Sequence, residues 1–458
     1  MNRVLTAGRP GGGAATGLVT AGLATSVCIA AGAALFPLLT IALAVAAALV
    51  TVTVANLTYG VAIFTMVTFF ERLPGVEGLA LSRPMGFVLV ISWLATLARG
   101  TRDIPLLPRD RPALAYVLVL LVGWGAISAL WAADSATAIS SAIRLALVVV
   151  LFFVVFTALR TPRDLMIVTW TFLAGAFLVS VVSLATGANK AGRLAAGELD
   201  PNFLAASLAA AIAVALFLLW GTSHSTTRFV LLVFMGTYAV SIVLTESRSG
   251  LVAAACAAIA ASLFGGPVRA RVVATVLVIA ALGVGYYAVL APSALRERVE
   301  TTAGSDAREP RLDSWNIALQ ISEDNPVLGV GLGNFRVVEP SYLNDQINLL
   351  TARKLHQINL VAHNTYLELL SELGIVGLTL FASAAAMTLL PAVRGVRRLG
   401  LRASQAALTT RGLVVGVVAL LAAYFFLSGF YAKQLWLLFG VLAAIPTVAA
   451  TITRERAG

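Results

Sequence analysis

The feature that most constrains this chain is a series of apolar runs, most of them about 20 residues long, between residues 17 and 452. A bilayer core is about 30 Å thick, and an apolar helix of about 20 residues crosses it while satisfying its own backbone hydrogen bonds. Of the 458 residues, 59% are hydrophobic and 12% are charged. A soluble domain carries roughly 25% charged residues. We therefore predict an all-α polytopic membrane protein.

The apolar runs predict about twelve to fourteen transmembrane helices. The range reflects three short runs, 58–70, 85–98 and 249–264, each of which is compatible with a re-entrant or tilted helix. The expected helices cover residues 17–36, 37–57, 58–70, 85–98, 113–131, 142–159, 165–186, 203–220, 228–245, 249–264, 270–291, 366–390, 411–430 and 434–452.

The charges between the runs are distributed unequally. Counted alternately from a cytoplasmic N-terminus, the inner connections hold 18 basic and 4 acidic residues, whereas the outer connections hold 14 basic and 17 acidic residues. This asymmetry matches the positive-inside rule, so we expect both termini in the cytoplasm. It also argues against nucleic acid as a partner. We expect three parts: an N-terminal transmembrane bundle (1–291), an extracytoplasmic loop with amphipathic helices (292–365) and C-terminal transmembrane helices (366–458).

The large loop contains one clear helix pattern. Pro310 suits the first position of a helix, which we expect to run to Ser322 before the break at Asp324-Asn325-Pro326. Leu312, Trp315 and Leu319 would share one face of this helix. A second helical segment is expected at 341–355.

A glycine-rich run, Gly329-Val330-Gly331-Leu332-Gly333-Asn334, follows the first helix of the loop. Such a run suggests a nucleotide-binding loop, but it does not connect a strand to a helix in a βαβ unit. We therefore expect a tight loop near the membrane surface.

His363 lies where the loop ends and an apolar helix begins. The positive end of a helix dipole disfavours a protonated imidazole, and a neutral histidine can act as a general base. The alternative is an interfacial histidine that only caps the helix. Glu368 and Glu372 follow on roughly the same face, and either is a candidate to orient the imidazole.

Two arginines on the expected outer side need an explanation, because the positive-inside rule disfavours them there. Arg248 lies in the short turn between two apolar runs, and Arg311 begins the loop helix. Arginine binds phosphate through two parallel charge-assisted hydrogen bonds. Binding of an anion in an aqueous cavity is therefore one interpretation. Attachment to lipid headgroups for Arg248, and a solvated surface position for Arg311, are the alternatives.

A polar outer turn precedes the apolar run at 203–220. It contains Lys190, Arg193, Glu198, Asp200 and Asn202. This turn is either part of a substrate entrance or merely a polar connection. Since the acidic pair has no histidine near it in the sequence, a metal site is weakly supported. The arginines instead favour anion binding without a metal or cofactor.

Several segments together resemble the O-antigen ligase/polymerase superfamily. They are Asp200-Pro201-Asn202, Ser247-Arg248-Ser249-Gly250, the loop segments 311–319 and 325–335, and the segment 363–374 that begins with His363-Asn364. The resemblance covers about residues 200 to 380, and the expected topology extends it to the whole chain.

The resemblance implies a fold similar to GT-C glycosyltransferases and an activity in cell-surface polysaccharide assembly. Members transfer a glycan from a polyprenyl (undecaprenyl-type) diphosphate carrier to an acceptor on the outer face of the bacterial cytoplasmic membrane, without a metal. It implies that Arg248 and Arg311 hold the diphosphate and that His363 activates the acceptor hydroxyl. Arg193, Lys190, Asn202 and Glu368 are further candidates for substrate binding.

The acceptor stays open at this point. A ligase uses a lipid or a cell-wall glycan, a polymerase uses the growing repeat unit, and a third possibility is protein glycosylation. A transporter or flippase is the rival from another class, although the sequence has no clear internal repeat and its polar residues gather at the outer rim rather than at the midplane. A signalling or structural membrane protein is a more distant alternative.

Overall fold

The computed structural model describes residues 37–70, 82–100, 104–187, 189–190, 193–196, 200–289, 310–342, 361–398 and 405–455. These residues form helices apart from one small antiparallel hairpin of β1 (Asn189–Lys190) and β2 (Arg193–Leu194). The main helices are α2 (Pro37–Ala55), α3 (Leu57–Phe70), α4 (Ser82–Ala98), α6 (Pro112–Ile127), α7 (Ser135–Ala158), α8 (Pro162–Thr186), α9 (Pro201–Gly221), α10 (Ser225–Leu244), α11 (Arg248–Phe264), α12 (Arg269–Val289), α14 (Pro310–Asp324), α17 (Thr365–Arg398), α18 (Gln405–Ala423) and α19 (Lys433–Glu455). Short helices are α5 (Leu107–Asp110) and α15 (Phe335–Val338), with 3-10 turns at Ser128–Leu130, Gly266–Val268 and Glu339–Tyr342.

The prediction of an all-α polytopic membrane protein is confirmed. Seven of the described helices are long and apolar enough to cross a membrane, and α11 with α12 form an eighth candidate bent by 104°. In four further helices, α2, α3, α4 and α19, the apolar segment is shorter than 18 residues; these segments are Ala44–Ala55, Leu57–Phe70, Ser82–Ala98 and Lys433–Ala449. The expected number of spans stays a prediction, since it depends on whether these shorter helices also cross.

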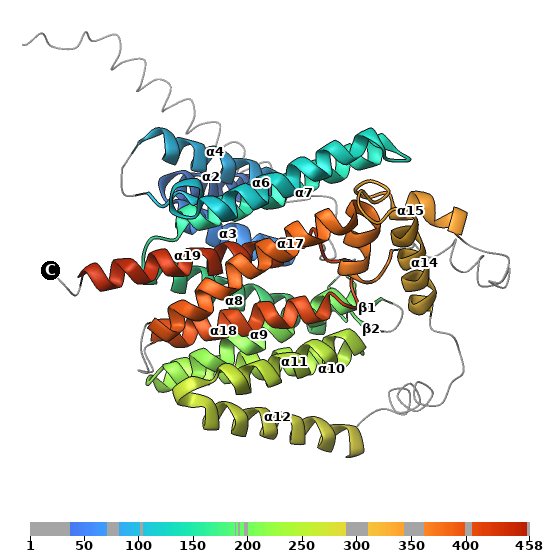
Figure 1. Cartoon of the computed structure of the whole chain (residues 1–458). Coiled ribbons are helices and arrows are strands. Elements are labelled where there is room, and N and C mark those ends of the chain that lie inside the picture. The colour runs from blue at the N-terminus through green and yellow to red at the C-terminus, as the bar shows by residue number, and fades with distance from the viewer. Residues whose placement is uncertain are drawn as a thin grey trace, which may run out of the picture.

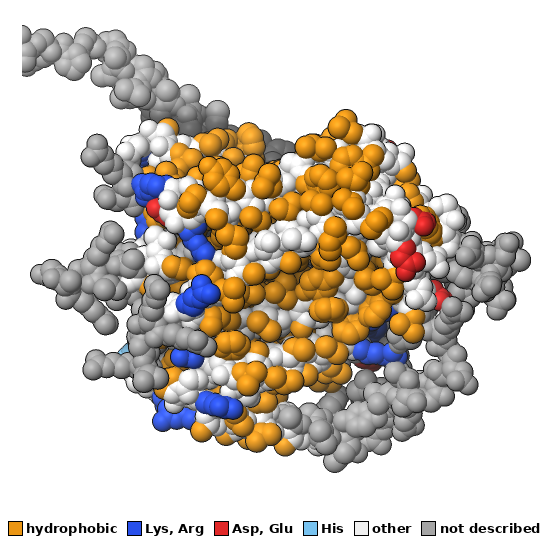
Figure 2. All heavy atoms as spheres, viewed as in Figure 1, with side chains coloured by type: hydrophobic (Ala, Val, Ile, Leu, Met, Phe, Trp, Pro, Cys, Tyr) orange, Lys and Arg blue, Asp and Glu red, His pale blue; other side chains and the backbone are white. Residues whose placement is uncertain are grey.

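The helices lie side by side and connect alternately at two ends of the bundle (Figure 1). At the first end, Thr58 of α3 bonds to the Ala158 carbonyl and to Asp164, and Arg271 lies over the Trp220 ring of α9. We call it the basic end, because arginines flank the helices that begin or end there, and Figure 2 shows Lys and Arg side chains gathered along that edge. The opposite end, which carries β1, β2, α14 and α15, we call the loop end.

Small residues hold the centre of the bundle together. In the most apolar 18-residue stretch of the helix α9, 78% of the residues are buried, and this helix packs most extensively against α18. A Cβ at Gly412 would lie 3.0 Å from the Val214 Cα, and one at Gly416 would lie 3.1 Å from the Ala210 carbonyl oxygen. This spacing of two glycines lets the two backbones approach closely, as is common between membrane helices.

The long helix α17 is broken at Gly374, where φ is 63° and ψ is −168°. The glycine run fits into this break. The amides of Val330 and Gly331 donate to the carbonyls of Ser371 and Glu372 (3.0 and 2.9 Å), and Ile375 donates to the Pro326 carbonyl (2.9 Å). A broken helix at membrane depth is tolerated only when such partners replace its lost hydrogen bonds. The run is a loop, as expected, and together with the Pro326 carbonyl it supplies hydrogen-bond partners that the broken helix lacks.

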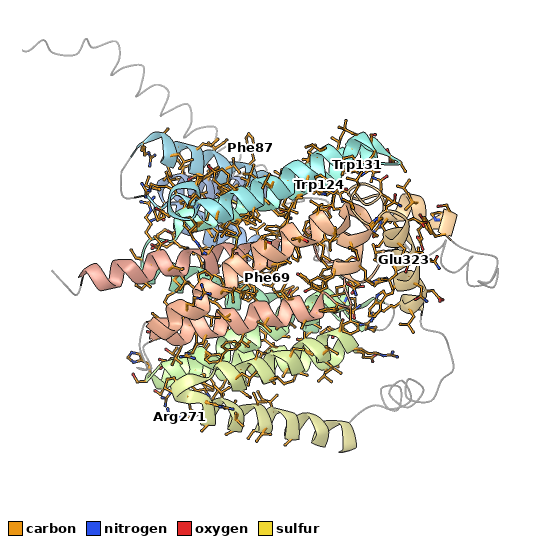
Figure 3. The ribbon with its side chains drawn as sticks, in the orientation of Figure 1. Phe69, Phe87, Trp124, Trp131, Arg271 and Glu323 are labelled. Atoms are coloured by element: carbon orange, nitrogen blue, oxygen red, sulfur yellow. The ribbon has the colours of Figure 1, made fainter. Side chains whose placement is uncertain are left out.

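Two tryptophans hold the same region from outside the loop. The indole of Trp124 donates to the Leu373 carbonyl (3.0 Å), and that of Trp131 donates to the Gly329 carbonyl (3.2 Å). Both residues lie at the loop end of the bundle, where Figure 3 labels them. Gly329, Gly331 and Gly333 all have positive φ angles (68°, 99° and 76°). Only glycine adopts these conformations readily, so the alternating glycines are a requirement of the backbone.

One predicted helix is confirmed at its start, and another is wrong at its end. The helix α14 begins at Pro310, and the face that carries Leu312 and Leu319 is exposed (49% and 43% at these residues), whereas Ile317, Ala318 and Ile321 are buried. The buried side packs in a small core with Phe335 and Ala362. The expected helix at 411–430 ends at Ala423, because the following segment holds Thr365: the Tyr424 carbonyl accepts from its amide (2.9 Å) and the Leu427 carbonyl from its hydroxyl (2.6 Å). The second loop helix expected at 341–355 falls mostly outside the described residues.

We expect Gly374→Ala to destabilise the folded protein by roughly 2–4 kcal/mol, because its φ angle is positive and a Cβ would overlap the Val327 carbonyl. Thermal unfolding of the purified protein in detergent measures this. The matched control is Gly123→Ala in α6, where nothing lies within 4 Å of an added Cβ. Equal unfolding midpoints for the two variants would contradict the role given to the break.

Candidate functional site

The turn between α10 and α11 is held by a network of polar side chains from three elements. The guanidinium of Arg193, on β2, donates to the Thr245 carbonyl (2.8 Å) and to the Asn202 side-chain oxygen (2.9 Å). The Ser247 hydroxyl donates to the same Asn202 oxygen (2.7 Å). The network therefore fixes the hairpin, the start of α9 and the turn relative to one another. Arg193 and Asn202, predicted to bind substrate, are both engaged with the protein itself.

Arg248 is the first residue of α11, and its side chain is exposed at the loop end. Ser247 caps the helix by accepting a hydrogen bond from the Gly250 amide (3.0 Å). The preceding residue, Glu246, has a φ of 48°. A capped helix start and a network-bound turn thus present this arginine at a fixed position.

His363 lies two residues before the first helical residue of α17, Thr365. It lies just outside the helix, because Asn364 is the capping residue: its side chain accepts from the amides of Tyr366 (3.0 Å) and Leu367 (3.1 Å). The backbone of His363 is left-handed, with a φ of 48°. Among the described residues, only Glu246 and His363 have positive φ without being glycine. Strained backbone of this kind concentrates at functional sites.

The imidazole of His363 is surrounded by charges from three other elements. Burial lowers the pKa of His363, the positive charges of Arg311 and Arg336 lower it further, and the negative charge of Asp200 raises it. A neutral imidazole is therefore favoured, as the sequence suggested, but mainly because the ring is buried rather than because of a helix dipole.

Arg311, in the first turn of α14, is close enough to act on His363 electrostatically. The helix is held against the segment before α17 by the small core of Ile317, Ala318 and Ala362. Among the residues that the structure describes, Arg311 makes no hydrogen bond or ion pair. Its donors are thus available to a ligand.

Glu372 has a structural role, contrary to the expectation that it is a candidate to orient His363. Its carboxylate accepts hydrogen bonds from the amides of Gly333 (2.7 Å) and Phe335 (3.2 Å). These bonds anchor the end of the glycine run to the broken helix. Glu368 lies one turn earlier on α17, near Ser428 and Arg336. Its part in substrate binding stays a prediction.

The structure joins most of the predicted residues into one site at the loop end. Asp200 links the two halves, because it acts on His363 and also caps α9 next to Asn202, which belongs to the network of the Arg248 turn. Lys190 pairs with Arg193 in the hairpin through its backbone, and its side chain lies outside the described residues, as does Glu198.

Sequence reasoning missed Arg336, which acts on His363 from α15. The signal was present: Arg336 is a further arginine in the expected outer loop, where the positive-inside rule disfavours basic residues. The described part of the chain contains no group of three or more His, Cys, Asp or Glu residues that suits a metal ion. The site is therefore built from arginines, a histidine and strained backbone.

Comparison with known proteins identifies this region. Residues 230–382 match the family model described as O-antigen ligase, which covers the turn with Arg248, the loop helix, the glycine run and His363. No curated protein matches the chain. The chain therefore carries a domain of the O-antigen ligase/polymerase superfamily, and the resemblance found in the sequence is confirmed.

We expect Glu372→Ala to loosen the glycine run, because two buried amides would lose their acceptor at about 1–3 kcal/mol each. Hydrogen exchange of the amides in 330–338 should become about tenfold faster or more. Glu323→Ala, an exposed position on α14 labelled in Figure 3, is the control and should leave the exchange unchanged. Unchanged exchange in the Glu372 variant would contradict the anchoring role.

Proposed function

We propose that this chain transfers a glycan from a polyprenyl diphosphate carrier to an acceptor hydroxyl, without a metal, in cell-surface polysaccharide assembly. The observation that carries the proposal is the arrangement around His363. A partly buried imidazole on strained backbone feels the charge of Arg311, which has no partner among the described residues, and both residues lie within the segment that matches the O-antigen ligase family.

The two arginines of the family motifs suit the leaving group. When the bond between the anomeric carbon and the diphosphate oxygen breaks, the electron pair and negative charge stay on the diphosphate. Preorganised cations in a site shielded from water stabilise such developing charge strongly. Arg248 and Arg311 would supply them, each through a planar fork of donors that matches phosphate.

His363 suits the role of general base. Its lowered pKa keeps the imidazole neutral near pH 7, so a ring nitrogen can accept the proton of the acceptor hydroxyl as the oxygen attacks the anomeric carbon. The new bond forms on the side opposite to the leaving diphosphate. Direct displacement of this kind inverts the configuration of that carbon.

The charges of the bundle favour one orientation in the membrane. Arginines flank the basic end, whereas His363, Asp200 and Glu246 lie at the loop end. By the positive-inside rule the loop end faces away from the cytoplasm. The active face would then be extracytoplasmic, in a bacterial cytoplasmic membrane and with both termini inside.

A ligase and a polymerase would perform the same bond exchange and differ only in the acceptor. Incubation of the purified protein with a lipid-linked donor separates them: elongated lipid-linked glycan indicates a polymerase, and a glycan joined to a different lipid or glycan acceptor indicates a ligase.

We expect His363→Ala to lower the transfer rate by roughly 10²–10⁴-fold, the usual contribution of a general base. Arg248→Ala and Arg311→Ala should lower it by a similar order, since each removes a cation from the leaving group. The control is Arg394→Ala, an exposed arginine near the basic end of α17, which should leave the rate unchanged. Full activity of the His363 variant at normal protein level would refute the proposed mechanism.

The pH dependence gives an independent test. The base works only when neutral, so the rate should fall as the pH drops through the pKa of His363, which lies below 6.5. Removing a neighbouring positive charge raises this pKa, so the acidic limb of the residual activity of Arg311→Gln should move to higher pH. An acidic limb at the same pH in both proteins would show that the titrating group is not His363.

A further inference from the structure

Arg336 occupies a position that the family motifs do not assign. It is the second residue of α15, directly after the glycine run, and its side chain is exposed at the loop end. It acts electrostatically on His363, as Arg311 does from α14. Two arginines from different elements thus act on one imidazole.

The position of Arg336 is fixed by the backbone before it. The amide of Phe335 donates to the Glu372 carboxylate (3.2 Å), and Asn334 is tied to the α6–α7 connection, where its side-chain oxygen accepts from the Asp134 amide (2.7 Å). Phe335 itself is buried in the small core of α14. The backbone that carries the guanidinium is therefore held in place, as a preorganised binding group requires.

Neutralisation of nearby acids is the competing role for this arginine. Glu339, Glu368 and Glu372 all feel the charge of Arg336, but none forms an ion pair with it within the described part of the chain. Glu372 is already occupied by two backbone amides.

Glu339 is a weak counter-ion for the same arginine. Its side chain is 1% exposed, one of its carboxyl oxygens has no hydrogen-bond partner, and burial raises its pKa to about 7 although Arg336 opposes this shift. Near neutral pH this carboxyl is only partly charged. Among the described residues Arg336 therefore has no ion-pair partner, and its donors are available to another partner.

We propose that Arg336 is a further substrate-binding residue, which holds an oxyanion of the substrate at the loop end near His363. The proposal deepens the proposed function and rests on it. The oxyanion is either the diphosphate of the donor or an acidic group on the acceptor glycan. Both have the charge and the paired oxygens that a guanidinium fork binds.

The test is ligand binding to the full-length protein in detergent, measured by calorimetry with three probes: inorganic pyrophosphate, farnesyl diphosphate and glucuronate. Arg336→Ala should weaken at least one probe by about tenfold or more, the usual effect of losing a hydrogen bond to a charged group. Arg336→Lys should keep part of the affinity, because it retains the charge but not the fork. Arg394→Ala is the matched control, and unfolding midpoints show that each variant is folded.

Each outcome has a definite meaning. Weaker binding of the diphosphates identifies the donor as the partner of Arg336, and weaker binding of glucuronate alone identifies an acidic acceptor. Wild-type affinity for all three probes in Arg336→Ala overturns the assignment, while loss of binding in Arg311→Ala in the same series leaves the proposed function standing. A wild-type protein that binds none of the probes overturns both proposals together.

Discussion

The break in α17 is the constraint on which the rest of the site depends. A helix interrupted at Gly374 exposes carbonyls and amides at a depth where lipid cannot satisfy them. The backbone of the glycine run provides their hydrogen-bond partners. The indole N–H groups of Trp124 and Trp131 also donate to carbonyls of the broken helix and of the run. Because the same run leads into α15 and is anchored by Glu372, the repair of a helix also fixes the position of Arg336.

The site gathers around this scaffold from elements far apart in the sequence. Asn202 binds both Arg193 and Ser247, so the start of α9 and the Arg248 turn cannot move independently. His363 and Glu246 carry the strained backbone on the two sides. Arg311 and Arg336, which have no hydrogen-bond or ion-pair partner among the described residues, both act on the imidazole of His363. Strained backbone and unpaired charge of this kind cost stability in the folded protein.

Much of the fold could be predicted from the sequence, because a helix that crosses lipid requires a long apolar run. Long apolar runs and Pro310 at a helix start are local features, and each was read correctly, whereas the orientation inferred from the arginines stays a prediction. The errors arose where packing overrides local pattern. Leu312 and Leu319 share one face of α14, yet that face is exposed, and Ile317, Ala318 and Ile321 are buried on the other side. Tyr424 to Leu427 looked like part of a span, yet the carbonyls of Tyr424 and Leu427 accept hydrogen bonds from Thr365.

The sequence by itself determined the helical membrane class and the family, and it proposed His363, Arg248 and Arg311 as site residues, because residue type and spacing carry that information. Tertiary structure decided how each residue is used. In the folded chain Glu372 anchors the glycine run instead of orienting the imidazole, and Arg336 lies close enough to act on His363 electrostatically. The physical reason is that burial, charge proximity and hydrogen-bond partners are properties of the folded chain, set by contacts between residues that no local pattern relates.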